Sequence, residues 1–171
     1  MVLLLFLFPV CAAYGQQTVF DVPRADVLDK GKVYGELDGT VRAIDPLATF
    51  TPRVVVGIGN RIEAGMNFNG MSAPTVDQLD ISLTVKWRLW RGKNSGWSFY
   101  IGDDLFFPIR NRTYDAGNYF YTSFAKEWKH GTRIGFGGYD FTRNVVANAN
   151  RAGGQFTFEQ RVNNRLTLAA E

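Results

Sequence analysis

Several features that mark other classes of protein are scarce in this sequence. Cysteine and histidine occur once each, as Cys11 and His130. Beyond the first residues, no apolar run approaches the roughly 18 residues that a membrane-spanning helix needs. Charged residues make up 20% of the chain and the net charge is only +3, whereas nucleic-acid-binding proteins usually carry a strongly basic stripe. The sequence therefore predicts neither a transmembrane helix nor a nucleic-acid partner.

The N-terminus contains a short apolar run, MVLLLFLFPVCAAYG, that ends in small residues. Its last three residues, Ala13-Tyr14-Gly15, match the small-x-small pattern of a secretory cleavage site, although no basic residue precedes the run. We expect residues 1–15 to be a signal peptide and residues 16–31 to be a periplasmic N-terminal segment. Cleavage near Gly15 would remove Cys11, so the mature chain would have neither disulfide nor thiol chemistry.

Two segments alternate strictly between apolar and polar residues. In residues 32–44, one face carries Val33, Gly35, Leu37, Gly39, Val41 and Ala43, and the other carries Lys32, Tyr34, Glu36, Asp38, Thr40 and Arg42. In residues 80–90, one face carries Ile81, Leu83, Val85, Trp87 and Leu89, and the other carries Asp80, Ser82, Thr84, Lys86 and Arg88. This period of two predicts β-strands that lie between two different environments, because a helix would scatter the charges around its circumference.

Seven further segments alternate less cleanly, which gives nine expected strands. They are residues 50–59, 62–69, 97–107, 118–128, 132–142, 154–160 and 165–170. Short connections, at about residues 59–61, 91–96, 129–131 and 162–164, alternate with longer ones, at about 70–79, 108–117 and 143–153. In an antiparallel meander, this alternation of short and long connections places every long loop at the same end of the sheet. A sandwich with Greek-key crossovers does not require such an alternation.

With this architecture the chain resembles the outer-membrane β-barrel proteins of Gram-negative bacteria, including the porin-like class. The resemblance covers about residues 32–171 and rests on architecture instead of a residue-specific motif. It implies an all-β, antiparallel up-and-down transmembrane β-barrel in the bacterial outer membrane. It also implies insertion by the barrel-assembly machinery, contact with outer-membrane lipid and lipopolysaccharide, and a homo-oligomeric state such as porins often adopt.

Two features depart from this class. Bacterial single-chain barrels have an even number of strands, and nine are expected here. The chain also ends at Leu168-Ala169-Ala170-Glu171, in mid-strand, where the class typically has a terminal aromatic residue. We therefore expect C-terminal strands to be missing, and a complete barrel to have about ten to fourteen strands.

Charged residues are the main candidates for a functional site. Six are expected to line the interior: Lys32, Glu36, Asp38, Arg42, Lys86 and Arg88. They would either tune the ion selectivity of a water-filled pore or form a salt-bridged plug in a narrow lumen, and the sequence leaves both open. Five more are expected in the outer loops: Arg110, Arg112, Asp115, Arg143 and Arg151. They would contact lipopolysaccharide or an anionic solute, or form an ordinary solvated loop surface.

No catalytic, cofactor-binding or metal site is expected, and the chain is not predicted to be an enzyme. His130 falls in a predicted short turn, where a solvated residue is the simpler interpretation. Asp103 and Asp104 are neighbours on a strand, so they point to opposite faces and cannot act jointly. Aromatic residues near strand ends or faces predict an interfacial girdle or, in a soluble protein, a core: Trp87, Trp90, Trp97, Tyr119, Tyr121, Trp128 and Tyr139.

Three functions remain open at this point. The leading hypothesis is a passive, porin-like outer-membrane channel that lets small solutes cross a polar lumen. The second is a structural or adhesive barrel with a closed lumen. The third is a soluble periplasmic β-barrel or sandwich that binds an apolar ligand, and it requires the apolar faces to point inward.

Overall fold

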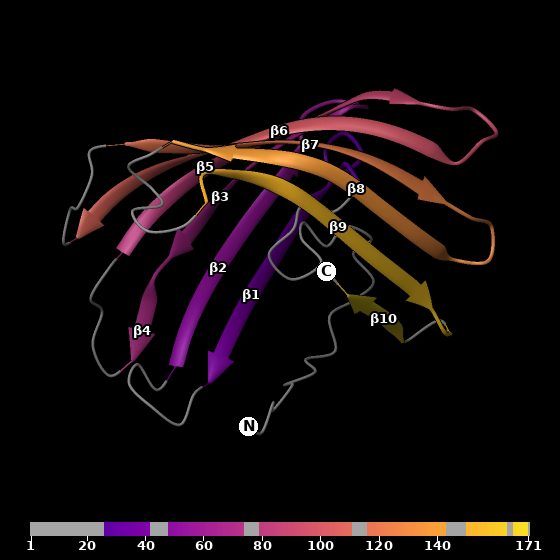
Figure 1. The fold of residues 1–171 in the computed structure, drawn as a ribbon. Helices are drawn as coiled ribbons and strands as arrows, with labels where there is room; N and C mark the ends of the chain where they lie inside the picture. The colour runs from indigo at the N-terminus through magenta and orange to yellow at the C-terminus, as the bar shows by residue number, and fades with distance from the viewer. Residues whose placement is uncertain are drawn as a thin grey trace.

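The computed structural model describes residues 26–41, 48–73, 79–110, 116–142, 150–163 and 166–170. Within these ranges the protein is all β and forms one antiparallel sheet of ten strands (Figure 1). The strands are β1 (Val33–Val41), β2 (Ala48–Gly57), β3 (Ile62–Asn69), β4 (Met71–Ala73), β5 (Leu79–Arg91), β6 (Trp97–Arg110), β7 (Gly117–Glu127), β8 (Thr132–Phe141), β9 (Ala152–Arg161) and β10 (Thr167–Ala170). All nine predicted strands are confirmed. The short β4 lies in a segment that the sequence predicts to be a loop.

The sheet is an up-and-down meander, in the order β1-β2-β3-β5-β6-β7-β8-β9-β10, with β4 added beside β2. It curls strongly, and the turns between β5 and β6 and between β7 and β8 lie together at the right of Figure 1. We call this end, with the turns that join β2 to β3 and β9 to β10, the short-turn end. β1 and β10 are the two edges and are not paired with each other in the described part of the chain, so the sheet is not closed into a barrel.

One face of the sheet, here called the inner face, is buried although most of its side chains are polar. Its buried members are Tyr34, Arg53, Val55, Glu63, Asn67, Ser82, Thr84, Lys86, Tyr100, Tyr121, Ser123, Ala125, Gln155, Thr157 and Glu159. They alternate along the strands, as the extended backbone requires. Charged and amide side chains are almost never buried in a water-soluble protein unless they are paired.

The opposite, outer face is apolar and exposed. Large hydrophobic side chains on it include Val33, Leu37, Val41, Val54, Val56, Met66, Phe68, Leu83, Val85, Trp87, Leu105, Phe107, Phe120, Phe124, Phe136, Phe156 and Leu168. Leu37 is 64% exposed and Val54 is 52% exposed, although both lie within paired strands. The polarity of this sheet is therefore the reverse of that in a water-soluble sandwich, whose apolar residues face the core. Separately, the described residues include no helix long and apolar enough to cross a membrane.

All four tryptophans of the chain belong to the outer face near the short-turn end. Trp87 and Trp90 lie in the last part of β5, Trp97 begins β6, and Trp128 follows the end of β7. Lys126 places its ammonium 5.4 Å from the centre of the Trp97 ring and 5.7 Å from that of Trp128. The tryptophan part of the predicted girdle is thus on the outer face, but Tyr119, Tyr121 and Tyr139 belong to the inner face and are packed together there.

Two glycines make room for these inner tyrosines. Gly102 pairs with Tyr121 across β6 and β7, and a Cβ at Gly102 would overlap the Tyr121 ring. Gly153 likewise pairs with Tyr139 across β8 and β9, and a Cβ at Gly153 would overlap the Tyr139 side chain. Each ring therefore lies flat over its partner strand at a point where only glycine leaves space.

Candidate functional site

A buried ion pair occupies the middle of the inner face. Glu63 on β3 and Lys86 on β5 are direct cross-strand partners, and 2.6 Å separates Glu63 Oε1 from Lys86 Nζ. The side chains are only 4% and 1% exposed, so each charge depends on the other for its stabilisation. The second carboxylate oxygen of Glu63 accepts a hydrogen bond of 2.6 Å from the backbone N–H of Leu28.

A second cluster lies beside the first, toward the β1 edge. Arg53 on β2 is the cross-strand partner of Glu36 on β1, and its Nη1 lies 3.2 Å from Glu36 Oε2. Its Nη2 lies 3.2 Å from Asp38 Oδ2. Both carboxylates come from the strictly alternating β1, whose period of two places them on the same face two residues apart. One guanidinium therefore bridges two acids.

A third cluster is centred on Arg133 of β8. Its guanidinium lies 2.9 Å from Asp26, 3.5 Å from Glu127 and 3.5 Å from Glu159. Glu127 and Glu159 come from the two strands that flank β8, so the sheet register alone brings them to Arg133. Asp26 comes from the segment before β1, 107 residues away in sequence. Both oxygens of its carboxylate accept hydrogen bonds from the Arg133 guanidinium, at 2.9 and 3.3 Å.

We call residues 26–32 the N-terminal strap, because they cross the inner face from β8 to β1. Val27 and Leu28 are buried, and Leu28 packs against Tyr34 and Val55. The strap is tied to β2 by backbone hydrogen bonds from Gly31 to Gly57 and from Gly57 to Lys32. A Cβ at Gly57 would overlap the backbone of Leu28 and Asp29, so the close approach of the strap depends on glycine at this position.

A β-bulge shapes the part of the inner face next to the short-turn end. Arg88 pairs with Tyr100, but Trp90 pairs with Phe99 and Arg91 with Ser98, so Leu89 is an extra residue on β5. A bulge of this kind reverses the alternation beyond it. Trp90 therefore joins the exposed outer face, and Arg91 joins Arg88 on the inner side.

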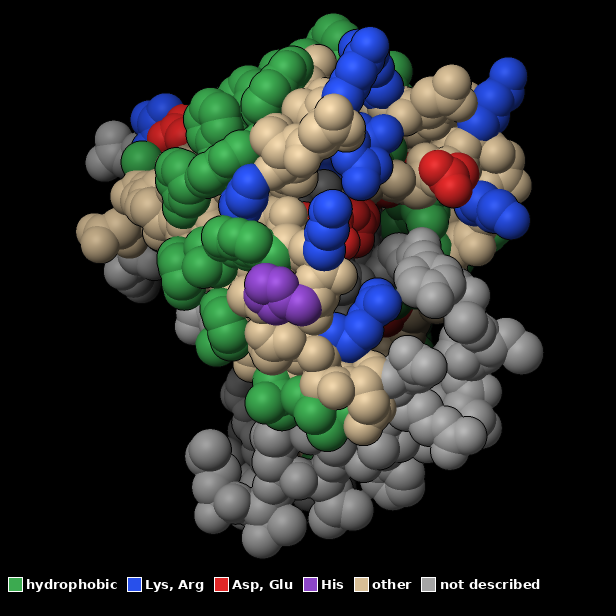
Figure 2. Space-filling model, turned by 90° about the vertical axis from the view of Figure 1, so that its right-hand side faces the viewer, with side chains coloured by type: hydrophobic (Ala, Val, Ile, Leu, Met, Phe, Trp, Pro, Cys, Tyr) green, Lys and Arg blue, Asp and Glu red, His purple; other side chains and the backbone are tan. Residues whose placement is uncertain are grey.

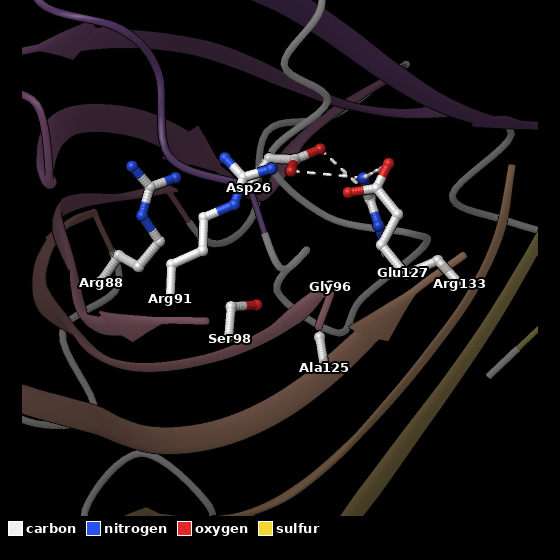
Figure 3. A pocket seen from close by; sticks show the side chains of 8 residues that line it. All are labelled: Asp26, Arg88, Arg91, Gly96, Ser98, Ala125, Glu127 and Arg133. Atoms are coloured by element: carbon white, nitrogen blue, oxygen red, sulfur yellow. Dashed lines mark hydrogen bonds and ion pairs between the residues drawn. The ribbon is translucent and has the colours of Figure 1, made fainter. Parts of the chain in front are cut away.

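The bulge opens onto a pocket, which Figure 3 shows from close by. It is lined by Asp26, Arg88, Arg91, Gly96, Ser98, Ala125, Glu127 and Arg133. Three arginines and two carboxylates thus share one small space. Figure 2 shows the molecule from the right-hand side of Figure 1, where the short turns lie, with Lys and Arg side chains gathered around a few acidic ones and hydrophobic side chains along the upper left.

The structure places four of the six predicted interior residues on the inner face. Glu36 and Asp38 share Arg53, Lys86 pairs with Glu63, and Arg88 lines the pocket. The structure does not bring the six predicted interior residues into one group, because those that it places belong to separate clusters. Lys32 is exposed in the strap and precedes β1, and Arg42 lies outside the described residues.

The predicted outer-loop residues are placed only in part. Arg110 is exposed at the end of β6. Arg151 is exposed just before β9 and forms a bidentate pair with Asp140, with both hydrogen bonds at 3.0 Å. Arg112, Asp115 and Arg143 lie outside the described residues, as does the predicted signal peptide at residues 1–15.

Sequence reasoning missed most partners of these charges. Arg53, Glu63, Arg133, Glu159 and Asp26 were not singled out, although each neutralises or bridges another charge on the inner face. Alternation within β3 and β9 already places Glu63 and Glu159 on the polar face. Which charges meet depends on the register between strands, which alternation within one strand does not reveal.

The remaining candidates for chemistry are dispersed. His130 is exposed in the turn between β7 and β8. Asp103 and Asp104 point to opposite faces, as predicted: Asp103 lies on the outer face and accepts a hydrogen bond of 3.1 Å from Asn118, and Asp104 lies on the inner face. In the described ranges, no group of three or more histidine, cysteine, aspartate or glutamate residues is arranged to hold a metal ion.

Compared with known proteins, the chain matches no family model, no curated protein sequence and no solved structure. A functional interpretation therefore depends on the distribution of its side chains. Two properties stand out: an exposed apolar face, and a buried polar face on which the charges are paired across neighbouring strands. The first can contact an apolar medium, and the second can enclose polar groups or water.

Proposed function

We propose that this chain is a membrane-spanning β-protein of the bacterial outer membrane, whose inner face lines a passive path for small solutes. The single observation that supports this most is the reversed polarity of the sheet. Lys86 is 1% exposed on the inner face, whereas its sequence neighbours Val85 and Trp87 are 45% and 46% exposed on the outer face. In lipid this arrangement is favourable on both sides, because the apolar face meets hydrocarbon and the polar face is shielded from it.

The same arrangement would be unfavourable in water. Leaving a large apolar side chain exposed forgoes about 1.5–3 kcal/mol relative to full burial, and the outer face repeats this at many positions. Contiguous apolar surface of this kind marks an interaction with a membrane or another protein. The soluble alternative predicted apolar faces that point inward, and the buried faces of β5 and β9 are polar instead.

The tryptophans support a membrane with a defined boundary. Trp and Tyr concentrate where a membrane meets water, because their rings are amphipathic. Here Trp87, Trp90, Trp97 and Trp128 gather near one end of the sheet, and Lys126 lies over two of their rings. We infer that the short-turn end lies at one interface of the bilayer, with the longer connections at the other.

A second function is favoured by a different observation. The inner face is filled by Tyr100, Tyr121 and the Glu63–Lys86 pair, and each of these side chains is less than 5% exposed. A small barrel whose interior is filled by side chains does not conduct. A structural or adhesive outer-membrane protein with a closed interior is therefore the alternative to a solute channel.

The membrane assignment is tested by quenching tryptophan fluorescence with brominated lipids. The full chain is reconstituted into vesicles whose lipids carry bromine either near the headgroup or near the end of the acyl chain. We expect strong quenching by both, and stronger quenching by the bromine near the headgroup, because the four tryptophans lie near one end of the outer face. Quenching by neither lipid, with protein that stays soluble without detergent, would rule out the proposal.

Conductance across planar bilayers separates the two membrane functions. A solute channel gives discrete conductance steps, and a closed barrel gives none although it inserts and is quenched in the vesicle experiment. The variant Lys86→Met with Glu63→Met removes both buried charges and tests whether they lie along the path. We expect it to change the ratio of cation to anion permeability if the inner face conducts. An unchanged ratio would place the conducting path elsewhere.

A further inference from the structure

The three arginines that line the pocket at the short-turn end differ in their partners. Arg133 has three carboxylates around it, from Asp26, Glu127 and Glu159. Arg88 and Arg91 form no ion pair within the described ranges, and the one hydrogen bond that Arg88 makes there is from Nη2 to the backbone oxygen of Asn60, at 2.8 Å. The pocket is therefore divided into an acidic half around Arg133 and a basic half around Arg88 and Arg91.

The backbone is adapted to bring these two arginines together. Without the extra residue Leu89, strict alternation would place Arg91 on the opposite face from Arg88. The bulge instead directs both side chains into the same pocket, and in Figure 3 their guanidinium groups extend in the same direction above Ser98. Arg91 and Arg61 repel the charge of Arg88, whereas Asp26 and Asp29 attract it without forming an ion pair with it. An anion bound between Arg88 and Arg91 would relieve the repulsion between these two like charges.

We propose that Arg88 and Arg91 form a binding site for a small oxyanion, either a carboxylate or a phosphate group, at the short-turn mouth of the inner face. Guanidinium groups bind such oxygens through paired N–H donors, and two of them can hold one anion from adjacent sides. Ser98 lines the same pocket and carries a hydroxyl that can donate a hydrogen bond. Asp26 lines the same pocket and is held by its two hydrogen bonds from Arg133.

This site goes beyond the proposed function, since it needs only a short-turn mouth that meets water. It exists equally in a channel and in a closed barrel. In a channel it would raise the local concentration of anions at one entrance. In a closed barrel it would be a surface binding site with no transport.

The site is tested by isothermal titration of the full chain, folded in a zwitterionic detergent, with inorganic phosphate. We expect saturable binding that weakens by about tenfold or more in Arg88→Gln and in Arg91→Gln, since each removes charged hydrogen bonds. The matched control is Arg161→Gln, which removes an exposed arginine at the end of β9 that does not line the pocket, and it should bind within about twofold of the parent chain. Near-UV circular dichroism of each variant checks that the aromatic packing is intact.

Each outcome decides the matter. Absence of binding to the folded parent chain, or equal loss in all three variants, would overturn the proposal. Titration with a short-chain phosphatidic acid distinguishes the source of the phosphate: binding of the lipid but not of free phosphate would show that the two arginines hold a headgroup, and not a soluble anion. A negative result in the phosphate titration would not change the result of the tryptophan-quenching experiment. The anion site and the membrane-spanning function can therefore be rejected independently of each other.

Discussion

Glu63 and Lys86 face one another across β3 and β5 with 2.6 Å between their charged atoms, and both side chains are almost completely buried. Lys86→Met would leave a buried carboxylate without its counter-charge, at a cost of about 3–5 kcal/mol. We expect the free energy of unfolding, measured by urea titration in the detergent in which the chain folds, to fall by that amount.

The double variant Lys86→Met with Glu63→Met provides the control for this prediction. It removes both charges, and the Leu28 N–H loses its acceptor, at a cost of about 1–3 kcal/mol. We therefore expect the double variant to be more stable than the single one. A double variant that is less stable than Lys86→Met would show that the pair does not depend on mutual neutralisation.

Gly102 and Tyr121 test the packing of the inner face. Because a Cβ at Gly102 would overlap the Tyr121 ring, Gly102→Ala should force the ring to move and cost about 1–3 kcal/mol in unfolding free energy. Gly35→Ala is the matched control, since the nearest atom to a Cβ there is 4.0 Å away. Equal stability of the two variants would mean that Tyr121 does not lie over Gly102.

The N-terminal strap can be released by a single methyl group. Gly57→Ala would overlap the backbone of Leu28 and Asp29, whereas Gly59→Ala meets nothing within 4 Å. We expect hydrogen exchange at the Leu28 amide, which is protected by Glu63, to accelerate by about tenfold or more in Gly57→Ala only. Parallel trypsin digestion should cut faster after Lys30 in the same variant. Unchanged exchange in Gly57→Ala would mean that the strap does not pass over β2.

Asp103 is a carboxylate in the middle of β6, on the exposed apolar face, opposite Val85 and Phe120. If that face meets lipid, the charge is unfavourable, and Asp103→Asn should stabilise the protein in vesicles by roughly 1 kcal/mol. The asparagine can still bond to Asn118, so the change isolates the charge. Asp80→Asn, on the inner face beside Asn69, is the control and should give no stabilisation. Stabilisation by both variants would point to a general effect of net charge.

The sequence predicted the strands and their order far better than the contacts between them. Alternation in β1, and in β5 as far as Arg88, assigned residues to the correct face, because successive residues of a regular strand point to opposite sides. The strap contacts, from Asp26 to Arg133 and from Leu28 to Glu63, had no signal in the sequence. They depend on how far the sheet curls, which results from the twist and packing of all its strands together.

The bulge at Leu89 shows the same limit within a single strand. Strict alternation over residues 80–90 assigned Leu89 to the apolar face, in line with Trp87. The structure inserts Leu89 as an unpaired position and turns Trp90 outward instead. A bulge is a property of the pairing with β6, so one strand considered alone cannot predict it.

The strap has a further consequence for how the protein folds. Neighbouring strands are also neighbours in sequence, so most of the sheet can form by closing short loops, which costs little chain entropy. The pair between Asp26 and Arg133 instead closes a loop of 107 residues, and Arg133 acquires its full set of acidic partners only after β7, β8 and β9 have assembled. Docking of the strap should therefore be among the last events of folding. The moment at which the Leu28 amide becomes protected from hydrogen exchange would then mark the completion of the sheet.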